Sequence, residues 1–237
     1  MAPKAEIING IKTFTVLENN PEVFNTLSAK LGLSPSYEWH DVYSLTEPSL
    51  LSLIPRPVLA LLDASIPAIY QGKGPDEPVL WFKQTIGEAC GSIGLIHCLL
   101  NGPASTHLLP DSFLSMIKAE AVDLDMEARA KLLYDSKDFE HAHQSVAEIG
   151  DSKMPSLDAE GHTGQHFVAF VKEGGRLWEL EGGRRGPLDR GLLEDHEDVL
   201  SPRTIELGIG RVIELERASG GGDLRFSCIA LAKKVEE

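Results

Sequence analysis

The residue best placed to do chemistry in this chain is Cys90, at the start of an apolar helical pattern. A loop of small residues precedes it, and Gln84 lies six residues upstream. The N-terminus of a helix has unpaired N–H groups and a partial positive charge, so a thiol there is expected to ionise easily. A nearby glutamine side chain could donate to a developing oxyanion. The segment therefore combines a candidate nucleophile with half of an oxyanion hole.

A nucleophilic cysteine needs a histidine base, and few of the eight histidines are suitably placed. His97 lies two helical turns, about 10.5 Å, beyond Cys90 and is interpreted as a packed helix residue. His141 and His143 lie in a polar stretch and are expected to be solvated. His166 instead opens an alternating, β-branched run that predicts a buried strand, so it is the candidate base.

A carboxylate partner for this histidine is expected at the same end of a β-hairpin. A second strand pattern follows the first after a four-residue turn and ends at Glu181. Because the start of one antiparallel strand lies beside the end of the next, His166 and Glu181 are expected to be close. A carboxylate there would fix the imidazole tautomer and stabilise the imidazolium. Gln84, Cys90, His166 and Glu181 therefore form a candidate constellation.

Each of these features also has a purely structural interpretation. Most cysteines are small, buried core residues, and a cross-strand histidine–glutamate pair often only stabilises a sheet. Cys98 and Cys228, the two other cysteines, lie in apolar runs and are interpreted as core. None of the three has the spacing of a metal site, so no metal or cofactor is expected.

The balance of charge narrows the class of partner. The chain has 22 Lys and Arg against 36 Asp and Glu, which gives a formal net charge of −14. Nucleic acid is not an expected partner, because phosphate backbones need clusters of basic residues. A negative surface steers basic ligands, although the same charge also serves solubility. The odd number of cysteines, without a signal peptide or an apolar run of bilayer length, favours the cytoplasm over a secreted or membrane location.

Periodicity and turn residues predict helices that alternate with strands. Asn20 is suited to cap a helix that ends at Gly32, and the Asn-Gly-Pro sequence at 101–103 ends the helix that begins at Cys90. The predicted helices cover 21–31, 47–53, 90–100, 110–121, 126–136, 138–147 and 201–217. The predicted strands cover 11–17, 37–42, 57–63, 165–171, 176–181 and 224–232. No segment has the composition of a domain linker, so residues 1–237 are expected to form one domain.

Taken in order, these motifs resemble those of the ubiquitin C-terminal hydrolases, the papain-like cysteine deubiquitinases of peptidase family C12. The resembling segments are 17–24, 41–43, 54–58, 84–87, 89–97, 166–169, 177–182 and 224–231. The resemblance implies an α+β, papain-like fold, with a central antiparallel β-sheet flanked by helices and a crossover loop, here 148–164, over the active site. It also implies a hydrolase that cleaves small or flexible adducts from the C-terminal glycine of ubiquitin through a thioester acyl-enzyme.

By the same resemblance, Cys90 is the nucleophile and His166 the general base and acid. Gln84 then forms the oxyanion hole with the N–H of Cys90. The chain departs from the family at Glu181, where an aspartate is usual, and the extra methylene moves the carboxylate by about one bond length. We favour Glu181 reaching His166 after a small backbone adjustment. One alternative is that the longer acid makes the site slower. The other is that a different acid takes its place, and Glu179 is the least favoured substitute because it lies farther from the strand end.

The expected partner is ubiquitin, bound by a monomer. The acidic N-terminal segment is expected to contact it through Glu18, Asn20 and Glu22. Two other functions stay open. One is a ubiquitin-binding protein with weak or no turnover, for which Glu181 is the supporting feature, and the other is a hydrolase that prefers a ubiquitin-like modifier such as Nedd8. A general papain-like protease is disfavoured by the long loop before His166.

Overall fold

The computed structural model describes residues 5–45, 47–64, 78–147, 149, 167–211, 213 and 227–234. Its helices are α1 (Pro21–Leu31), α2 (Pro48–Leu51), α3 (Cys90–Leu100), the 3-10 helix η1 (Pro103–His107), α4 (Phe113–Ala121), α5 (Met126–Asp135), α6 (Lys137–Val146) and α7 (Pro202–Leu207). Its strands are β1 (Glu6–Ile8), β2 (Ile11–Thr13), β3 (Tyr37–Asp41), β4 (Ala60–Ala64), β5 (Phe167–Glu173), β6 (Arg176–Leu180), β7 (Leu188–Leu192) and β8 (Cys228–Lys233).

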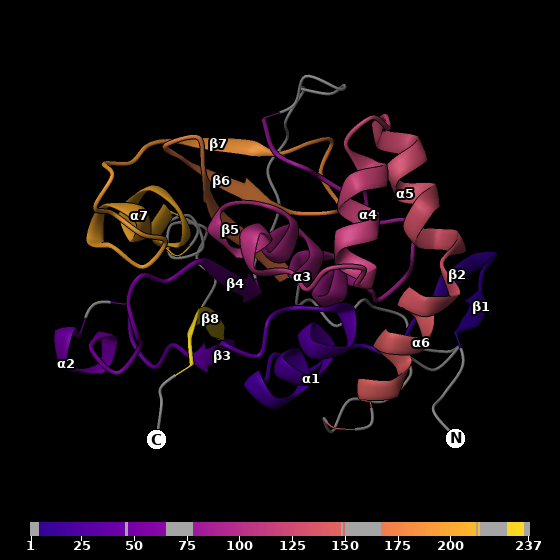
Figure 1. Ribbon diagram of the computed structural model, residues 1–237, viewed down its shortest axis with the longest axis horizontal. Coiled ribbons are helices and arrows are strands. Elements are labelled where there is room, and N and C mark those ends of the chain that lie inside the picture. Colours follow the sequence, from indigo (N-terminus) through magenta and orange to yellow (C-terminus); the bar gives the residue numbers. More distant parts are fainter. Residues whose placement is uncertain are drawn as a thin grey trace.

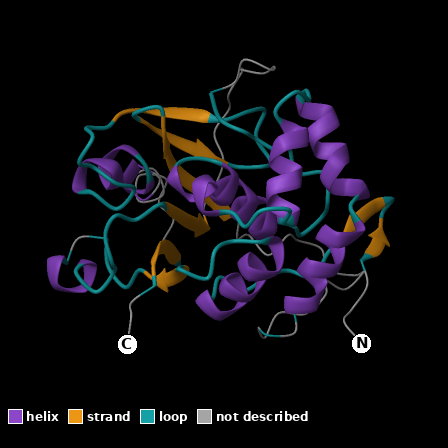
Figure 2. Ribbon diagram, viewed as in Figure 1, coloured by secondary structure: helices purple, strands orange, loops and turns teal. Residues whose placement is uncertain are grey.

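An antiparallel sheet of six strands forms the centre of the molecule (Figure 1). The strand order is β3-β8-β4-β5-β6-β7, and each neighbouring pair is antiparallel. Figure 2 shows helices on both sides of these strands. The α+β class and the central antiparallel sheet flanked by helices are therefore confirmed. The crossover loop expected at 148–164 lies outside the described residues, apart from Ile149.

The central strands bury both of their faces. Leu62 of β4 and Ala169 of β5 pack on the face that carries α1 and α3. Their chain neighbours Leu61 and Val168 belong to a second core on the opposite face, with Val199. Because successive side chains of a strand point to opposite faces, a sheet covered on both sides needs apolar residues at consecutive positions. The continuous apolar runs of β4 and β5 meet that requirement.

Helix α1 begins and ends where its capping residues predict. The side-chain oxygen of Asn20 accepts a hydrogen bond from the N–H of Glu22 (2.8 Å), and Pro21 occupies the first turn. Gly32 ends the helix in the left-handed conformation (φ 105°), and its N–H donates to the carbonyl of Ser28 (2.9 Å).

One predicted strand is shorter in the structure, and one predicted helix is interrupted. Strand β2 stops at Thr13, because the N–H of Phe14 turns away and donates to Gly87 (2.9 Å). The predicted helix 201–217 is interrupted: α7 ends at Leu207, and the chain is helical again at 209–211 and at Ile213, while 212 and 214–217 lie outside the described residues. A Cβ on Gly208 would lie 3.0 Å from the ring of Phe170, so this glycine allows a close approach to the sheet and interrupts the helix.

Strand β7 was not predicted from the sequence. It pairs with β6 at the edge of the sheet and remains partly exposed. Its centre is Asp189, Arg190 and Gly191, which show no apolar alternation, so the usual signal for a strand is missing. In the described part of the chain, no helix has the length and apolar character needed to span a bilayer.

Candidate active site

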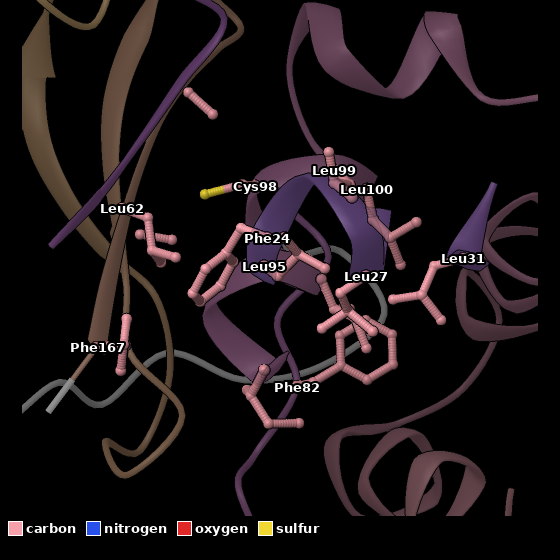
Figure 3. Close-up of a cluster of buried hydrophobic side chains, with 14 of the residues drawn as sticks. Phe24, Leu27, Leu31, Leu62, Phe82, Leu95, Cys98, Leu99, Leu100 and Phe167 are labelled. Atoms are coloured by element: carbon pink, nitrogen blue, oxygen red, sulfur yellow. The ribbon is translucent and has the colours of Figure 1, made fainter. Parts of the chain in front are cut away.

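Cys90 is the first residue of α3, a helix that is buried along its whole length. Figure 3 shows the side chains around this helix, with Leu62 and Phe167 on the strand side and Phe24 of α1 among the neighbours. Gly94 lets α3 lie directly on the sheet, because a Cβ there would be 2.6 Å from Cδ1 of Leu62. Helix α3 is therefore held against the sheet, and Cys90 begins this helix as the sequence predicted.

The loop before Cys90 is tied to the chain at two points. At one end, the N–H of Gln84 donates to the carbonyl of Gly182 (2.8 Å), one residue beyond the candidate acid. At the other end, the N–H of Gly87 donates to Lys12 (2.8 Å), and Gly87 accepts from Phe14 (2.9 Å). Since backbone hydrogen bonds hold both ends, the path of the chain into the helix is well defined.

Gly182 brings the acid segment against both the candidate oxyanion residue and α3. A Cβ on Gly182 would lie 2.9 Å from Cβ of Gln84 and 2.9 Å from Cγ2 of Ile93. Ile93 belongs to the first turn of α3, so Gln84, the start of the helix and the end of β6 share one packed junction. The Nε2 of Gln84 donates to the carbonyl of Ile86 (3.2 Å), which uses one of its two N–H donors.

Cys90 is only 7% exposed, and this burial overturns an expectation from the sequence. Burial raises the pKa of the Cys90 thiol to about 11; the Glu88 carboxylate also raises it, and backbone hydrogen bonds from Phe167 and Gly91 oppose the rise. The prediction that the helix N-terminus would ease ionisation is therefore wrong, because desolvation outweighs it. A thiolate at neutral pH needs a nearby proton acceptor.

The candidate acid Glu181 lies just after β6 and is almost fully buried. Its Oε1 accepts a hydrogen bond from the N–H of Gly183, and its Oε2 accepts from Nε of Arg184 (3.3 Å). The backbone at the same position is also held, because Nε1 of Trp81 donates to the Glu181 carbonyl (3.1 Å). The carboxylate therefore has a defined position at the end of the hairpin.

Glu179, the alternative acid, is engaged with two arginines. It forms ion pairs with Arg184 and Arg190, and Nε of Arg190 donates to it (2.5 Å). The side chains of Glu179, Glu181 and Arg184 are all buried, so two carboxylates and two guanidiniums form one cluster. Arg184 bridges both carboxylates.

His166, the candidate base, lies outside the described residues, which resume at Phe167. The register of the hairpin pairs Ala169 with Leu180, so the beginning of β5 lies beside the end of β6. The closeness of His166 to Glu181 remains a prediction.

The segment expected to bind a partner lies beside the start of α3. A Cβ on Gly91 would be 3.4 Å from Cβ of Leu17, so the residues that follow Leu17 are close to the candidate nucleophile. Glu18 and Glu22 are exposed, as a binding role requires. The side chain of Asn20 caps α1, so its observed role is structural.

His143 was expected to be solvated, and the structure shows the opposite. Its ring is fully buried. Nδ1 lies 2.5 Å from Oγ of Ser92, and Nε2 lies 2.6 Å from the carbonyl oxygen of Thr15. Burial lowers its pKa to about 4. The spacing of Phe139, Ala142, His143 and Val146 follows the apolar face of a helix, and that period could have predicted the burial.

The other histidine near α3 behaves as the sequence predicted. His97 is fully buried, and its Nε2 accepts from the N–H of Phe82 (2.9 Å). Burial lowers its pKa to about 4 as well. Cys98 and Cys228 are buried and form no disulfide, in agreement with their interpretation as core residues. Within the described ranges, no group of three or more His, Cys, Asp and Glu side chains could hold a metal ion.

Comparison with known proteins identifies the family. The model of the family "Ubiquitin carboxyl-terminal hydrolase, family 1" matches residues 14–213. Ubiquitin carboxyl-terminal hydrolase 3 of Arabidopsis thaliana is 34% identical over 94% of this chain and 96% of its own length. A probable ubiquitin carboxyl-terminal hydrolase of Dictyostelium discoideum is 30% identical over 100% of this chain and 94% of its own.

The fold is also that of a solved member of this family. The UCH37 catalytic domain of Trichinella spiralis, bound to ubiquitin vinyl methyl ester, superposes with a TM-score of 0.72 at 22% identity, over 94% of this chain and 96% of that one. This superposition shows the fold, and the sequence matches show the family relationship. This chain therefore belongs to family 1 of the ubiquitin carboxyl-terminal hydrolases.

Proposed function

We propose that this chain is a thiol-dependent hydrolase that removes small or flexible adducts from the C-terminal glycine of ubiquitin. Membership of the family supports the reaction class. The observation that carries the proposal is the junction at Gly182, where Gln84, the first turn of α3 and the end of β6 meet. That junction brings an amide donor and the carboxylate segment against the first turn of the helix that Cys90 begins.

The proposed reaction starts with transfer of the Cys90 proton to His166. The thiolate attacks the carbonyl carbon of the terminal glycine, and an N–H of Gln84 and the N–H of Cys90 stabilise the oxyanion. His166 then donates its proton to the leaving amine as the C–N bond breaks, which leaves a thioester on Cys90. Water, deprotonated by His166, hydrolyses the thioester and releases ubiquitin with a free carboxylate. Glu181 orients the imidazole and stabilises the imidazolium.

The burial of Cys90 supports an essential role for the base. A thiol whose pKa is raised to about 11 is almost entirely protonated at neutral pH. Proton transfer to His166 therefore has to accompany attack, and a shift in the position of Glu181 should lower the rate of that step.

The charge of the chain supports a basic partner. The net charge is −14, and Glu18 and Glu22 are exposed beside the start of α3. We assign these two carboxylates to ubiquitin contact, with Asn20 setting the direction of α1 between them. Because exposed charges are screened by salt, binding should weaken as ionic strength rises.

A ubiquitin-binding protein with little turnover is the second candidate. The raised pKa of Cys90 and the longer acid at Glu181 favour it. The third candidate is a hydrolase that prefers Nedd8 to ubiquitin. We also propose a monomer, since the candidate site is built from elements of one chain. A cytoplasmic location is supported by three buried cysteines that form no disulfide, which suits a reducing compartment.

The deciding experiment uses ubiquitin with a C-terminal vinyl methyl ester, which traps a reactive thiol. Wild type and Cys98→Ala, a matched change of the other cysteine on α3, should each gain the mass of one ubiquitin, and Cys90→Ala should gain none. Absence of an adduct from wild type that still binds ubiquitin would favour the binding protein. A Nedd8 probe run in parallel measures the preference, and light scattering measures the oligomeric state.

A further inference from the structure

The loop that follows Glu181 leaves a space that the carboxylate fills. A Cβ built on Gly183 would lie 2.7 Å from Oε1 of Glu181, 3.7 Å from its Cδ and 3.8 Å from its Oε2. These three nearest atoms all belong to one carboxylate. We propose that Gly183 is a positioning residue for Glu181: the missing side chain provides the space that this acid occupies, and the Gly183 N–H holds it there.

The contacts of the carboxylate support this assignment. The N–H of Gly183 donates to Oε1, and Nε of Arg184 donates to Oε2 (3.3 Å). Arg184 is held in turn by its ion pair with Glu179, which also pairs with Arg190. A glutamate has one more rotatable bond than an aspartate, so its carboxylate samples more positions unless neighbouring groups restrict it. The two consecutive donors supply that restriction.

The backbone of Gly183 does not itself require glycine. Its φ lies outside the left-handed region, unlike that of Gly186 or Gly191, so an alanine can adopt its conformation. Gly183 is also exposed, and its Cβ would meet the far end of a flexible side chain. Substitution by alanine should therefore displace the carboxylate while the fold stays intact.

Gly182 provides the contrasting case. A Cβ there would meet Cβ of Gln84 and Cγ2 of Ile93 at 2.9 Å and the backbone nitrogen of Gln84 at 3.2 Å. Those atoms belong to the loop and to α3, which cannot move aside without disturbing the core. Alanine at 182 should destabilise the protein, whereas alanine at 183 should act on one side chain.

The size of the expected effect follows from the distance. Oε1 has to move from 2.7 Å to the 3.4 Å at which ordinary contact with a Cβ begins. Misplacement of a catalytic group by about 1 Å costs on the order of 100-fold in rate, so this smaller displacement should cost roughly tenfold in kcat. The inference rests on the proposed function, because Glu181 must assist the reaction for its position to matter.

The test is a double-mutant cycle of Gly183→Ala and Glu181→Asp, followed by hydrolysis of a ubiquitin C-terminal amide. In the Glu181 background, Gly183→Ala should lower kcat roughly tenfold with KM and the thermal midpoint nearly unchanged. In the Glu181→Asp background the same change should cost about twofold or less, because the shorter acid no longer reaches the added Cβ. Arg185→Ala, at the exposed neighbouring position, is the control for a general effect of the loop.

Either of two kinetic results would overturn the inference while leaving the proposed function intact. One is an equal loss of kcat in both backgrounds, and the other is a Gly183→Ala enzyme with wild-type kcat. A large drop in the thermal midpoint would equally count against it, since a structural role predicts that outcome. Absence of turnover in wild type would instead refute the proposed function and, with it, this inference.

Discussion

Titration of His143 should make the stability of this protein fall as the solution becomes acidic. The carbonyl of Thr15 can only accept a hydrogen bond, so the proton of the neutral ring lies on Nε2, and Nδ1 accepts from the hydroxyl of Ser92. A second proton on the ring would face that hydroxyl and place a charge in a fully buried site. The folded state therefore resists protonation.

The magnitude follows from the pKa. Burial lowers the pKa of His143 from its ordinary value of 6.5 to about 4. The unfolded chain binds a proton below about pH 6.5, whereas the folded chain binds it only near pH 4, so stability is complete above the first value and is lost as the pH falls toward the second. The difference corresponds to about 3 kcal/mol for this residue. Burial also lowers the pKa of His97 to about 4, so this residue adds a second loss of stability over the same pH range.

The assay is urea unfolding at a series of pH values between about 7 and about 4. The informative variant is His143→Gln with Ser92→Ala: the glutamine keeps a donor for Thr15, and the alanine removes the hydroxyl that would lose its acceptor. As the pH falls through the full titration of the histidine, the free energy of unfolding of this variant should decrease by about 3 kcal/mol less than that of wild type. His141→Gln, at an exposed position of the same helix, should keep the wild-type pH dependence. A His143 variant with an unchanged pH dependence would refute the reasoning.

Three further predictions concern single residues. Alkylation of Cys90 in a His166→Ala variant, which lacks the proposed base, should be slow at neutral pH and accelerate as the pH rises toward 11. Mass spectrometry of the labelled peptide would measure the rate, and a rate that levels off near neutrality would contradict the raised pKa. Arg184→Gln should lower the free energy of unfolding in urea by about 3–5 kcal/mol, because two buried carboxylates lose their shared partner. The matched change at an exposed position, Arg185→Gln, should lower it by less than about 0.5 kcal/mol. Asn20→Ala should lose about 1 kcal/mol by the same assay, and no loss would mean that the cap contributes nothing.

Local chemistry explains which elements could be predicted from the sequence. The ends of α1 follow from a capping asparagine and a left-handed glycine, and α3 follows from a continuous apolar run after a small-residue loop. Both signals lie within a few residues of the feature they predict. The alternation of two cores across β4 and β5 follows in the same way from consecutive apolar positions.

Burial set by distant segments explains what could not be predicted. The thiol of Cys90 was expected to ionise easily from its place on a helix, yet its desolvation depends on strands that come later in the chain. His143 was interpreted as solvated from its polar neighbours, although its partner Thr15 lies more than a hundred residues away. The pairing of Glu179 with Arg190 needs strand β7, which itself carries no apolar alternation.

The most direct test of the central claim is hydrolysis of ubiquitin that carries a fluorophore amide on its C-terminal glycine. We predict release of the fluorophore by wild type and by Cys98→Ser at comparable rates, and no release by Cys90→Ser. Glu181→Asp should be no faster than wild type, because Gly183 and Arg184 are placed for the longer acid. Release by Cys90→Ser at the wild-type rate, or no release by wild type, would contradict a thiol hydrolase acting through Cys90.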